Sequence, residues 1–459
     1  MRNLLALATA LLCASLYFLW VNAGVRQIAL FPYKPNQIAV AFVLAIGAAS
    51  LLVPARRKAM LSVVQSNQTF LAVFSSFLLL QLMTVIWASP HGNFIYLLGK
   101  QAAYFLCALF VASALTGEAR HKTLKAVYFG LLAGLAVFTT VFVILSAILG
   151  SGVVAVVTGA LLEGDANALQ FKVFTLLFNF SDGELIGKGD ADFQGTALRN
   201  TLVGVFVVTS VLFWSRTENA LSGRFLGTSY ATVAVTLLCG FFTIASVSRS
   251  NILVFAIAGV VVVMTSILYQ SSQSTSKRQS RWFLSLAGFA VLLASGNLLV
   301  EFVQGLATIG VERFGNFANE PRWIMYGEAL RGIEQSILLG HGLGAEIESF
   351  GHRVHNLFLA AWYEGGLVLF LFSVAMYVAL MRTVFVVHQK SIVLRRFCSE
   401  LLLLAPGGIL ALSILPLFRP LISGEAGAFT LVEWFCVAFL LAERSNARAA
   451  VRQIRAAAL

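Results

Sequence analysis

The chain has 459 residues, of which 59% are hydrophobic and only 11% are charged. Soluble domains are about half apolar and about a quarter charged, so this composition excludes an ordinary soluble protein and indicates a polytopic membrane protein. The net charge of +12 does not point to a nucleic acid partner, because the basic residues follow a membrane-topology pattern. The five cysteines show no paired spacing and predict neither a disulfide framework nor a zinc site.

Apolar runs long enough to cross a bilayer follow one another along the whole chain. The first run lacks a convincing cleavage site for a signal peptide, so we interpret it as a span. The sequence predicts an all-α polytopic membrane protein with a single integral membrane domain over residues 1–459 and about 12 spans. These runs lie at 4–20, 37–53, 69–88, 95–116, 126–149, 198–214, 229–247, 251–269, 282–300, 357–380, 400–418 and 428–442.

The loops between these runs alternate in basic content. Most of the 32 Lys and Arg residues lie in one set of loops, for example at 56–58 and 120–125. By the positive-inside rule these loops and both termini are cytoplasmic. The opposite side then holds two long loops, at 150–197 and 301–356, which are periplasmic if the protein lies in a bacterial inner membrane.

The second long loop contains a predicted amphipathic helix. Apolar residues in NEPRWIMYGEALRGIEQSILLG repeat at spacings of three and four, namely Trp323, Tyr326, Leu330, Ile333 and Ile337. Pro321 suits the first turn, Asn319 suits the cap, and the following GHGLG ends the helix. We expect this helix to lie over the outer mouth of the bundle. The first long loop includes VFTLLFNF, which is too short to span and fits an interfacial segment.

Four basic side chains stand at the predicted outer edge of the membrane. Arg199 begins the sixth span, Arg249 separates two spans in SVSRSNILVF, Arg322 begins the amphipathic helix, and His355 begins the tenth span. An arginine at a helix end also commonly extends to lipid head groups, and a histidine at a span start is commonly an interfacial residue. The small neighbours of Arg249 and the cluster around His355 favour functional roles.

Two carboxylate features are less specific. Glu364 falls within the tenth span, where an acidic residue is a functional candidate, although helical phase on an ideal helix turns it away from His355. WYEGG also fits a kink whose glutamate binds a neighbouring helix, with Lys100 as a candidate partner. Asp190 and Asp192 form a short paired-aspartate match, but their Gly-rich surroundings favour a solvated turn over a metal site.

The order of these segments resembles the O-antigen ligase and polymerase superfamily. The resemblance covers residues 198–380 and rests on SVSRSNILVF, PRWIMYGEAL, LLGHGLG and HNLFLAAWYEGGLVLFLF in this order. It implies a multi-span glycosyltransferase of the GT-C type, which takes a glycan from a polyprenyl (undecaprenyl) diphosphate carrier at the periplasmic face. Ligases pass the glycan to a sugar hydroxyl of lipid A-core, whereas polymerases pass it to a second carrier-linked repeat.

The resemblance also implies roles for individual residues. The functional arginines of the family match Arg249 and Arg322, and its functional histidine matches His355. Members work without a nucleotide cofactor or a metal. The segment DFQGTALRNTLVG departs from the pattern of many polymerases, which weakens the match of Arg199 and favours a ligase.

The chemistry of the transfer agrees with these residue types. Negative charge develops on the diphosphate as the glycosidic bond breaks, and fixed guanidinium groups stabilise it. His355 is the candidate base for the acceptor hydroxyl, oriented by Asn356 or a carboxylate. The predicted partners are therefore the lipid-linked donor, the lipid A-core acceptor and membrane lipids.

A transporter of lipid-linked sugars is the competing class. It also needs basic residues near a lipid diphosphate, and Lys100 with Glu364 would suit ion coupling. The candidate polar residues concentrate at one face of the membrane, which favours an enzyme.

Overall fold

The computed structural model describes residues 2–16, 35–87, 93–117, 120–148, 321–350, 354, 356–394 and 427–458. Within these ranges all regular secondary structure is helical, as the composition predicts. The described helices are α1 (Arg2–Ser15), α3 (Pro35–Ser50), α4 (Pro54–Ser66), α5 (Gln68–Thr84), α6 (Asn93–Ala114), α7 (Arg120–Ile148), α16 (Pro321–Gln335), α17 (Ala345–Phe350), α18 (Leu357–Leu394) and α20 (Gly427–Ala458).

One described helix segment, Leu357–Thr383 within α18, is long and apolar enough to cross a membrane by itself. The pair Gln37–Ser50 and Pro54–Ser66 meets the same criterion together but is bent by 111°. Asn3–Ser15, Gln68–Thr84 and Leu98–Ala114 are shorter apolar helices. The count of twelve spans therefore stays a prediction, and five of the predicted runs and the loop 150–197 lie outside the described residues.

Several helices extend into stretches that the sequence assigned to loops. The basic residues at 56–58 belong to α4, which begins at Pro54 because proline at the start of a helix lacks only a donor that is unused there. Arg56 is buried rather than displayed on a loop. Likewise α18 continues to Leu394 and α20 to Ala458, well past the apolar runs that predicted them. Charged residues end a membrane span without ending a helix.

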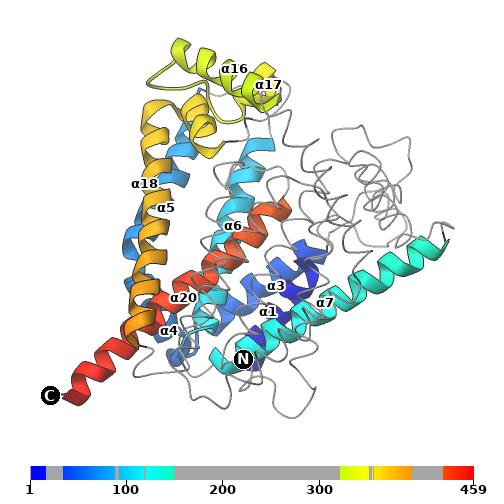
Figure 1. Cartoon of the computed structure of the whole chain (residues 1–459), viewed down its shortest axis with the longest axis vertical. Coiled ribbons are helices and arrows are strands. Elements are labelled where there is room, and N and C mark those ends of the chain that lie inside the picture. The colour runs from blue at the N-terminus through cyan, green and yellow to red at the C-terminus, as the bar shows by residue number, and fades with distance from the viewer. Residues whose placement is uncertain are drawn as a thin grey trace, which may run out of the picture.

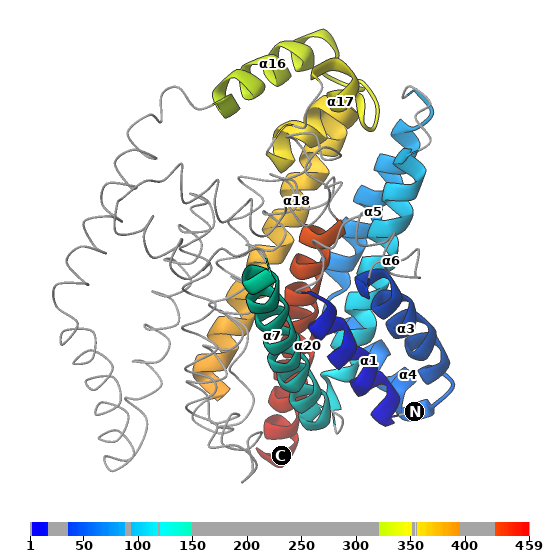
Figure 2. The ribbon, with the colours of Figure 1, turned by 90° about the vertical axis from the view of Figure 1, so that its right-hand side faces the viewer.

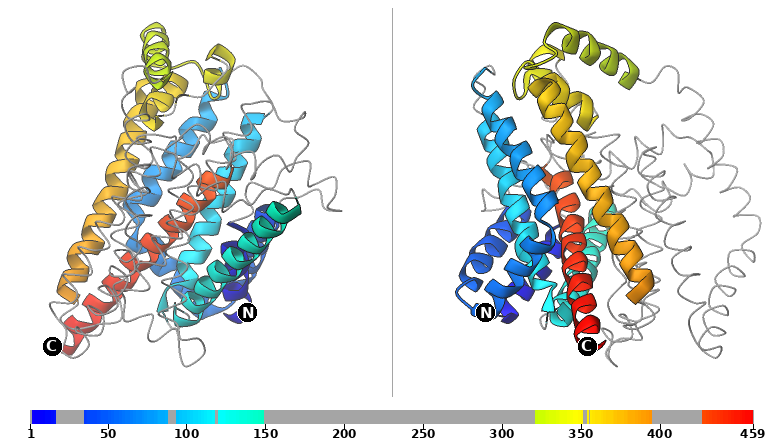
Figure 3. Two further views of the ribbon diagram at one scale, coloured as in Figure 1. Left: turned by 45° about the vertical axis from the view of Figure 1, so that its right-hand side comes forward. Right: turned by 90° about the vertical axis from the view of Figure 1, so that its left-hand side faces the viewer.

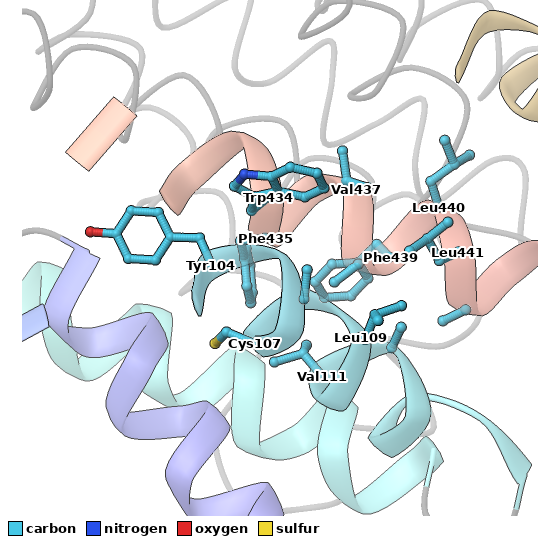
Figure 4. Packing of buried hydrophobic residues seen from close by; sticks show 14 of the residues in the cluster. Tyr104, Cys107, Leu109, Val111, Trp434, Phe435, Val437, Phe439, Leu440 and Leu441 are labelled. Atoms are coloured by element: carbon cyan, nitrogen blue, oxygen red, sulfur yellow. The ribbon is translucent and has the colours of Figure 1, made fainter. Parts of the chain in front are cut away.

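Large apolar side chains hold the helices together. Trp434 of α20 makes edge-to-face ring contacts with Phe74 of α5 and Phe105 of α6, at centroid distances of 4.6 and 5.5 Å. Figure 4 shows side chains of α6, including Tyr104 and Cys107, gathered with those of α20 in this cluster. Such aromatic pairs contribute about 0.5–1.5 kcal/mol beyond burial of their area. The C-terminal helix is therefore part of the core formed by the N-terminal helices.

The bundle has two distinct ends. Both termini and α4 lie at one end, whereas α16 and α17 lie at the other (Figures 1 and 2). The α16 helix lies across the end of α18 instead of alongside it (Figure 3). This is the placement expected for a helix that covers the mouth of the bundle; the compartment that each end faces rests on the distribution of basic residues.

Candidate functional site

The α16 helix packs directly against the entrance of α18. Ala329 is fully buried in a small cluster with Val354 and Ala360, and Tyr326 packs against this cluster. Ile333 is also buried, whereas Leu330 and Ile337 of the predicted apolar stripe are exposed. The face of α16 that packs inward therefore carries the buried Ala329 and Ile333 and the partly buried Tyr326.

The helix begins at Pro321, as predicted, and Arg322 lies in its first turn. The side chain of Arg322 is outside the part that the structure describes. Arg199, Arg249 and His355 also lie outside the described residues, as does the proposed cap Asn319. The structure thus places the segments next to Arg322 and His355 and leaves the roles of these side chains as predictions.

The glycine-rich turn after α16 is attached to a break in α18. Gly366 has φ 67° and ψ −165°, which interrupts the helix. In a regular helix the amide of Leu367 would donate to the carbonyl of Tyr363. Here the Leu367 amide donates to the Ile337 carbonyl at 2.8 Å, and the Tyr363 carbonyl accepts from the His341 amide at 2.8 Å. The turn thereby satisfies backbone groups that the break in α18 exposes.

Glycine is needed on both sides of this junction. Gly340, Gly342 and Gly344 all have positive φ angles, of 69°, 93° and 84°. A Cβ atom on Gly366 would overlap the Leu338 carbonyl oxygen, and one on Gly340 would lie 2.5 Å from the Gly366 amide nitrogen. The two backbones approach too closely for any side chain, so the predicted turn and the predicted kink form one structural unit.

Glu364 is the buried acidic residue of this junction. Its side chain is 3% exposed, and its Oε1 accepts a hydrogen bond from the Gly344 amide at 2.9 Å. Its backbone carbonyl accepts another from the Gly342 amide at 2.8 Å. The kink predicted at WYEGG is confirmed at Gly366, and the Glu364 carboxylate binds the glycine turn, where the sequence predicted a neighbouring helix. Lys100, the candidate partner of Glu364, lies in α6, and its pairing with Glu364 stays a prediction.

The predicted opposition of His355 and Glu364 rested on an ideal helix through both residues. The helix begins only at Leu357, so His355 precedes it and helical phase does not relate the two positions. The relative orientation of the two side chains stays a prediction, since His355 lies outside the described residues. The cap of α18 is Asn356, whose Oδ1 accepts hydrogen bonds from the amides of Phe358 and Leu359 at 2.9 and 3.1 Å.

A second buried carboxylate holds the residue on the other side of His355. Glu346 of α17 is 1% exposed, and its Oε2 accepts a hydrogen bond from the Val354 amide at 2.8 Å. His355 therefore stands between two residues that side-chain oxygens anchor, Val354 and Asn356. The sequence pattern does not single out Glu346; its only signal is an acidic residue two positions after the glycine turn.

His341, the histidine of GHGLG, lies at the centre of the same junction. Its ring stacks on Tyr363 at a centroid distance of 4.5 Å, and its Nε2 lies 2.8 Å from the Gly332 carbonyl oxygen. Tyr363 in turn donates a hydrogen bond to Ser349 at 2.9 Å. These contacts join α16, α17 and α18, so His341 has a structural role at the junction.

The described residues hold no group of three or more His, Cys, Asp and Glu side chains that could bind a metal ion. Asp190 and Asp192, the weak metal candidate, lie outside the described residues. The buried carboxylates in the described site accept backbone hydrogen bonds. These hydrogen bonds attach Gly344 to Glu364 and Val354 to Glu346.

Comparison with known proteins connects this site to a family. No curated protein matches the chain. A family model described as O-Antigen ligase matches residues 234–374, a range that includes Arg249, α16, the glycine turn, His355 and the break at Gly366. Arg199 lies outside the match. Residues 234–374 are therefore similar to the O-antigen ligase family, in agreement with the resemblance to the O-antigen ligase and polymerase superfamily of membrane proteins.

Proposed function

We propose that the protein is a glycosyltransferase that moves a glycan from undecaprenyl diphosphate to a sugar hydroxyl of lipid A-core at the periplasmic face. The family match supports a membrane glycosyltransferase of the ligase and polymerase type. The observation that carries the proposal further is the packing of Ala329 in α16 against Val354, the residue before His355. Arg322 lies one helical turn before Tyr326 in the same contact.

The proposed reaction is one direct displacement. The acceptor hydroxyl oxygen attacks the anomeric carbon, the bond from that carbon to the diphosphate oxygen breaks, and the anomeric configuration inverts. Arg249 and Arg322 bind the diphosphate and stabilise the charge that grows on the leaving oxygen, with Arg199 assisting. His355 takes the proton of the hydroxyl. No metal or nucleotide takes part.

The junction supports this chemistry because it holds the segment that contains Arg322 at a fixed position relative to the segment that contains His355. Arg322 and His355 are 33 positions apart in the numbering, and the chain between them contains two helices and a turn. Backbone hydrogen bonds to Tyr363 and Glu364, together with the Glu346 and Asn356 contacts, attach that chain to α18. An error of about 1 Å in such an arrangement can lower a rate about 100-fold, so rigid attachment favours catalysis.

A polymerase, which extends a second carrier-linked repeat, is the alternative within the superfamily. The departure of DFQGTALRNTLVG from the pattern of many polymerases favours the ligase. Both enzymes need the same donor chemistry and the same kind of base. They differ in the acceptor, so the acceptor is the quantity to measure.

The deciding experiment supplies the purified, reconstituted protein with a polyprenyl-diphosphate glycan. Parallel reactions contain either lipid A-core or a second lipid-linked repeat. Extension of lipid A-core alone supports the ligase, and extension of the lipid-linked repeat supports the polymerase. Movement of the donor across the bilayer with neither acceptor extended would replace the enzyme proposal by a transporter.

The arginine role has its own test in the same assay. Arg322→Lys keeps a positive charge but loses the planar pair of donors that fits two phosphate oxygens. We expect a fall in transfer of about tenfold or more, in line with the loss of a charge-assisted hydrogen bond. Unchanged transfer would mean that a simple point charge suffices at this position.

A further inference from the structure

The end of the bundle opposite α16 carries a row of arginines on α20. This helix continues past its predicted span at 428–442 and ends at Ala458. Arg444, Arg448, Arg452 and Arg455 follow one another at spacings of four, four and three, which places them along one face of the helix. The sequence from 444 to 459 contains no acidic residue.

The inner part of this row is built into the junction of three helices. Arg444 is 9% exposed, and its Nη1 donates a 2.6 Å hydrogen bond to the hydroxyl of Thr383 in α18. Arg448 donates through Nη1 to the Gln65 carbonyl of α4 at 2.9 Å. Arg382, the residue before Thr383, is exposed beside them. Figure 1 shows α4 and the lower parts of α18 and α20 together at this end.

These three guanidinium groups repel one another. Burial, together with the charges of Arg448 and Arg382, lowers the pKa of Arg444 from its ordinary value. An arginine nevertheless keeps its proton in proteins, so the repulsion persists. Like charges at such a partly buried site interact more strongly than in water, because the surroundings screen them less.

No carboxylate of the described residues is paired with this cluster. The nearest in sequence, Glu443, is bound to Arg120 of α7, with Nη2 and Oε1 2.8 Å apart. The buried Nε of Arg444 has no hydrogen-bond partner among the described side chains and backbone. An anion with several oxygens would supply both the missing acceptor and the missing negative charge.

We propose that Arg382, Arg444 and Arg448 bind the phosphate head group of an anionic phospholipid. The cluster begins two residues past the predicted end of the α20 span, which is the depth at which lipid phosphates lie. The exposed Arg452 and Arg455 extend the same face and add attraction to a negatively charged membrane surface. The site is independent of the proposed transfer reaction, which uses the opposite end of the bundle.

The test compares two double variants of the full-length protein that lose equal charge. Arg382→Gln with Arg448→Gln removes the two outer members of the cluster, whereas Arg452→Gln with Arg455→Gln removes the two arginines beyond it. Arg444 is left in place because its buried contact with Thr383 also supports folding. Unfolding temperature without added lipid establishes that both variants fold.

Binding is measured in detergent with short-chain phosphatidylglycerol, and with short-chain phosphatidylcholine as the uncharged comparison. For phosphatidylglycerol we expect the cluster variant to lose affinity by on the order of tenfold, and the outer variant to lose clearly less. Equal losses in the two variants would overturn the site in favour of diffuse surface charge. Equal affinity of the unchanged protein for the two lipids would overturn it as well.

Inorganic phosphate competes in a further arm of the experiment. If the site binds a lipid head group, phosphate at the same concentration displaces little phosphatidylglycerol, because the acyl chains add apolar contacts at the membrane edge. Complete displacement at equal concentration would identify a free-anion site and overturn the lipid assignment. Retained glycan transfer in the cluster variant is expected in either case.

Discussion

The two ends of the bundle are joined by different kinds of contact. At the α16 end, loop and helix meet through backbone hydrogen bonds that glycines make accessible, including those from the Gly342 and Leu367 amides. At the opposite end, long side chains connect the helices, as in Arg120 with Glu443 and Arg444 with Thr383. A backbone contact fixes geometry closely, whereas a side-chain contact adjusts, so the α16 end is the better support for catalysis.

A substitution at the entrance of α18 should lower the rate of glycan transfer most strongly while leaving the stability of the protein unchanged. His355→Ala should lower glycan transfer by about 10²–10⁴-fold, the usual contribution of a general base. The unfolding temperature should stay unchanged, since the adjacent anchors Val354 and Asn356 are kept. Normal transfer by the purified variant would show that another group takes the proton.

At the opposite end of the bundle, where side chains connect the helices, a substitution should lower the free energy of unfolding instead of the rate of transfer. Arg120→Met leaves the buried carboxylate of Glu443 without its ion-pair partner and should cost about 3–5 kcal/mol. Chemical unfolding in detergent measures this loss. Exposed Lys122, on the same helix, is the matched control, and Lys122→Met should change little. If Arg120→Met were as stable as the control, the ion pair would contribute nothing.

The same variant should become sensitive to pH. Burial raises the pKa of Glu443, and Arg120 partly opposes this, so removing Arg120 raises that pKa further. When the pKa of a carboxyl group is higher in the folded than in the unfolded protein, the protein becomes less stable as the pH rises from the lower to the higher of these two values. Arg120→Met should therefore be less destabilised near pH 5 than near pH 8. The double variant with Glu443→Met should lose this dependence.

At the backbone-joined end, Gly366→Val should disturb stability and transfer together. Its positive φ and its contact with the Leu338 carbonyl each oppose a side chain, and such strain and overpacking each cost about 1–3 kcal/mol. Gly99→Ala is the control, because a Cβ atom there meets nothing within 4 Å. A tolerated Gly366→Val would mean that the break in α18 does not require glycine.

The smallest effects are expected at Glu364, where two substitutions distinguish the contribution of its charge from that of its hydrogen bond. Glu364→Ala leaves the Gly344 amide without its acceptor and should cost about 1–3 kcal/mol. Glu364→Gln keeps an oxygen at the same place and should cost less. Both are measured by unfolding and by transfer. If the glutamine variant were fully inactive but stable, the negative charge itself would be needed for function.

Much of the α16 end could be predicted from local patterns. Pro321 marks the start of the helix, the glycines mark its end, and WYEGG marks the break in α18. These features depend on φ angles and donors that individual residues impose. The partner of Glu364 could not be predicted, because the Gly344 amide lies 20 positions away in a turn that comes next to Glu364 only when α16 packs against the start of α18.

The structure of the opposite end of the bundle follows less directly from the sequence. The basic residues at 56–58 and after 443 indicate topology, and the same signal does not tell a loop from a helix that continues beyond the membrane. Arg56 and Arg444 proved to be buried helical residues. Their positions depend on α4, α18 and α20 meeting, which no single segment encodes.

Composition and local pattern are enough to predict a helical membrane protein that resembles O-antigen ligases, and to locate the end of α16 and the break in α18. Composition and backbone conformation are local properties, so they can be read along the chain. Which polar groups meet depends on the tertiary structure: the Glu364 carboxylate accepts from the Gly344 amide, and the Arg444 guanidinium donates to the Thr383 hydroxyl. Such pairs form because apolar helix packing brings distant segments together, and each buried polar group then takes the partner within reach.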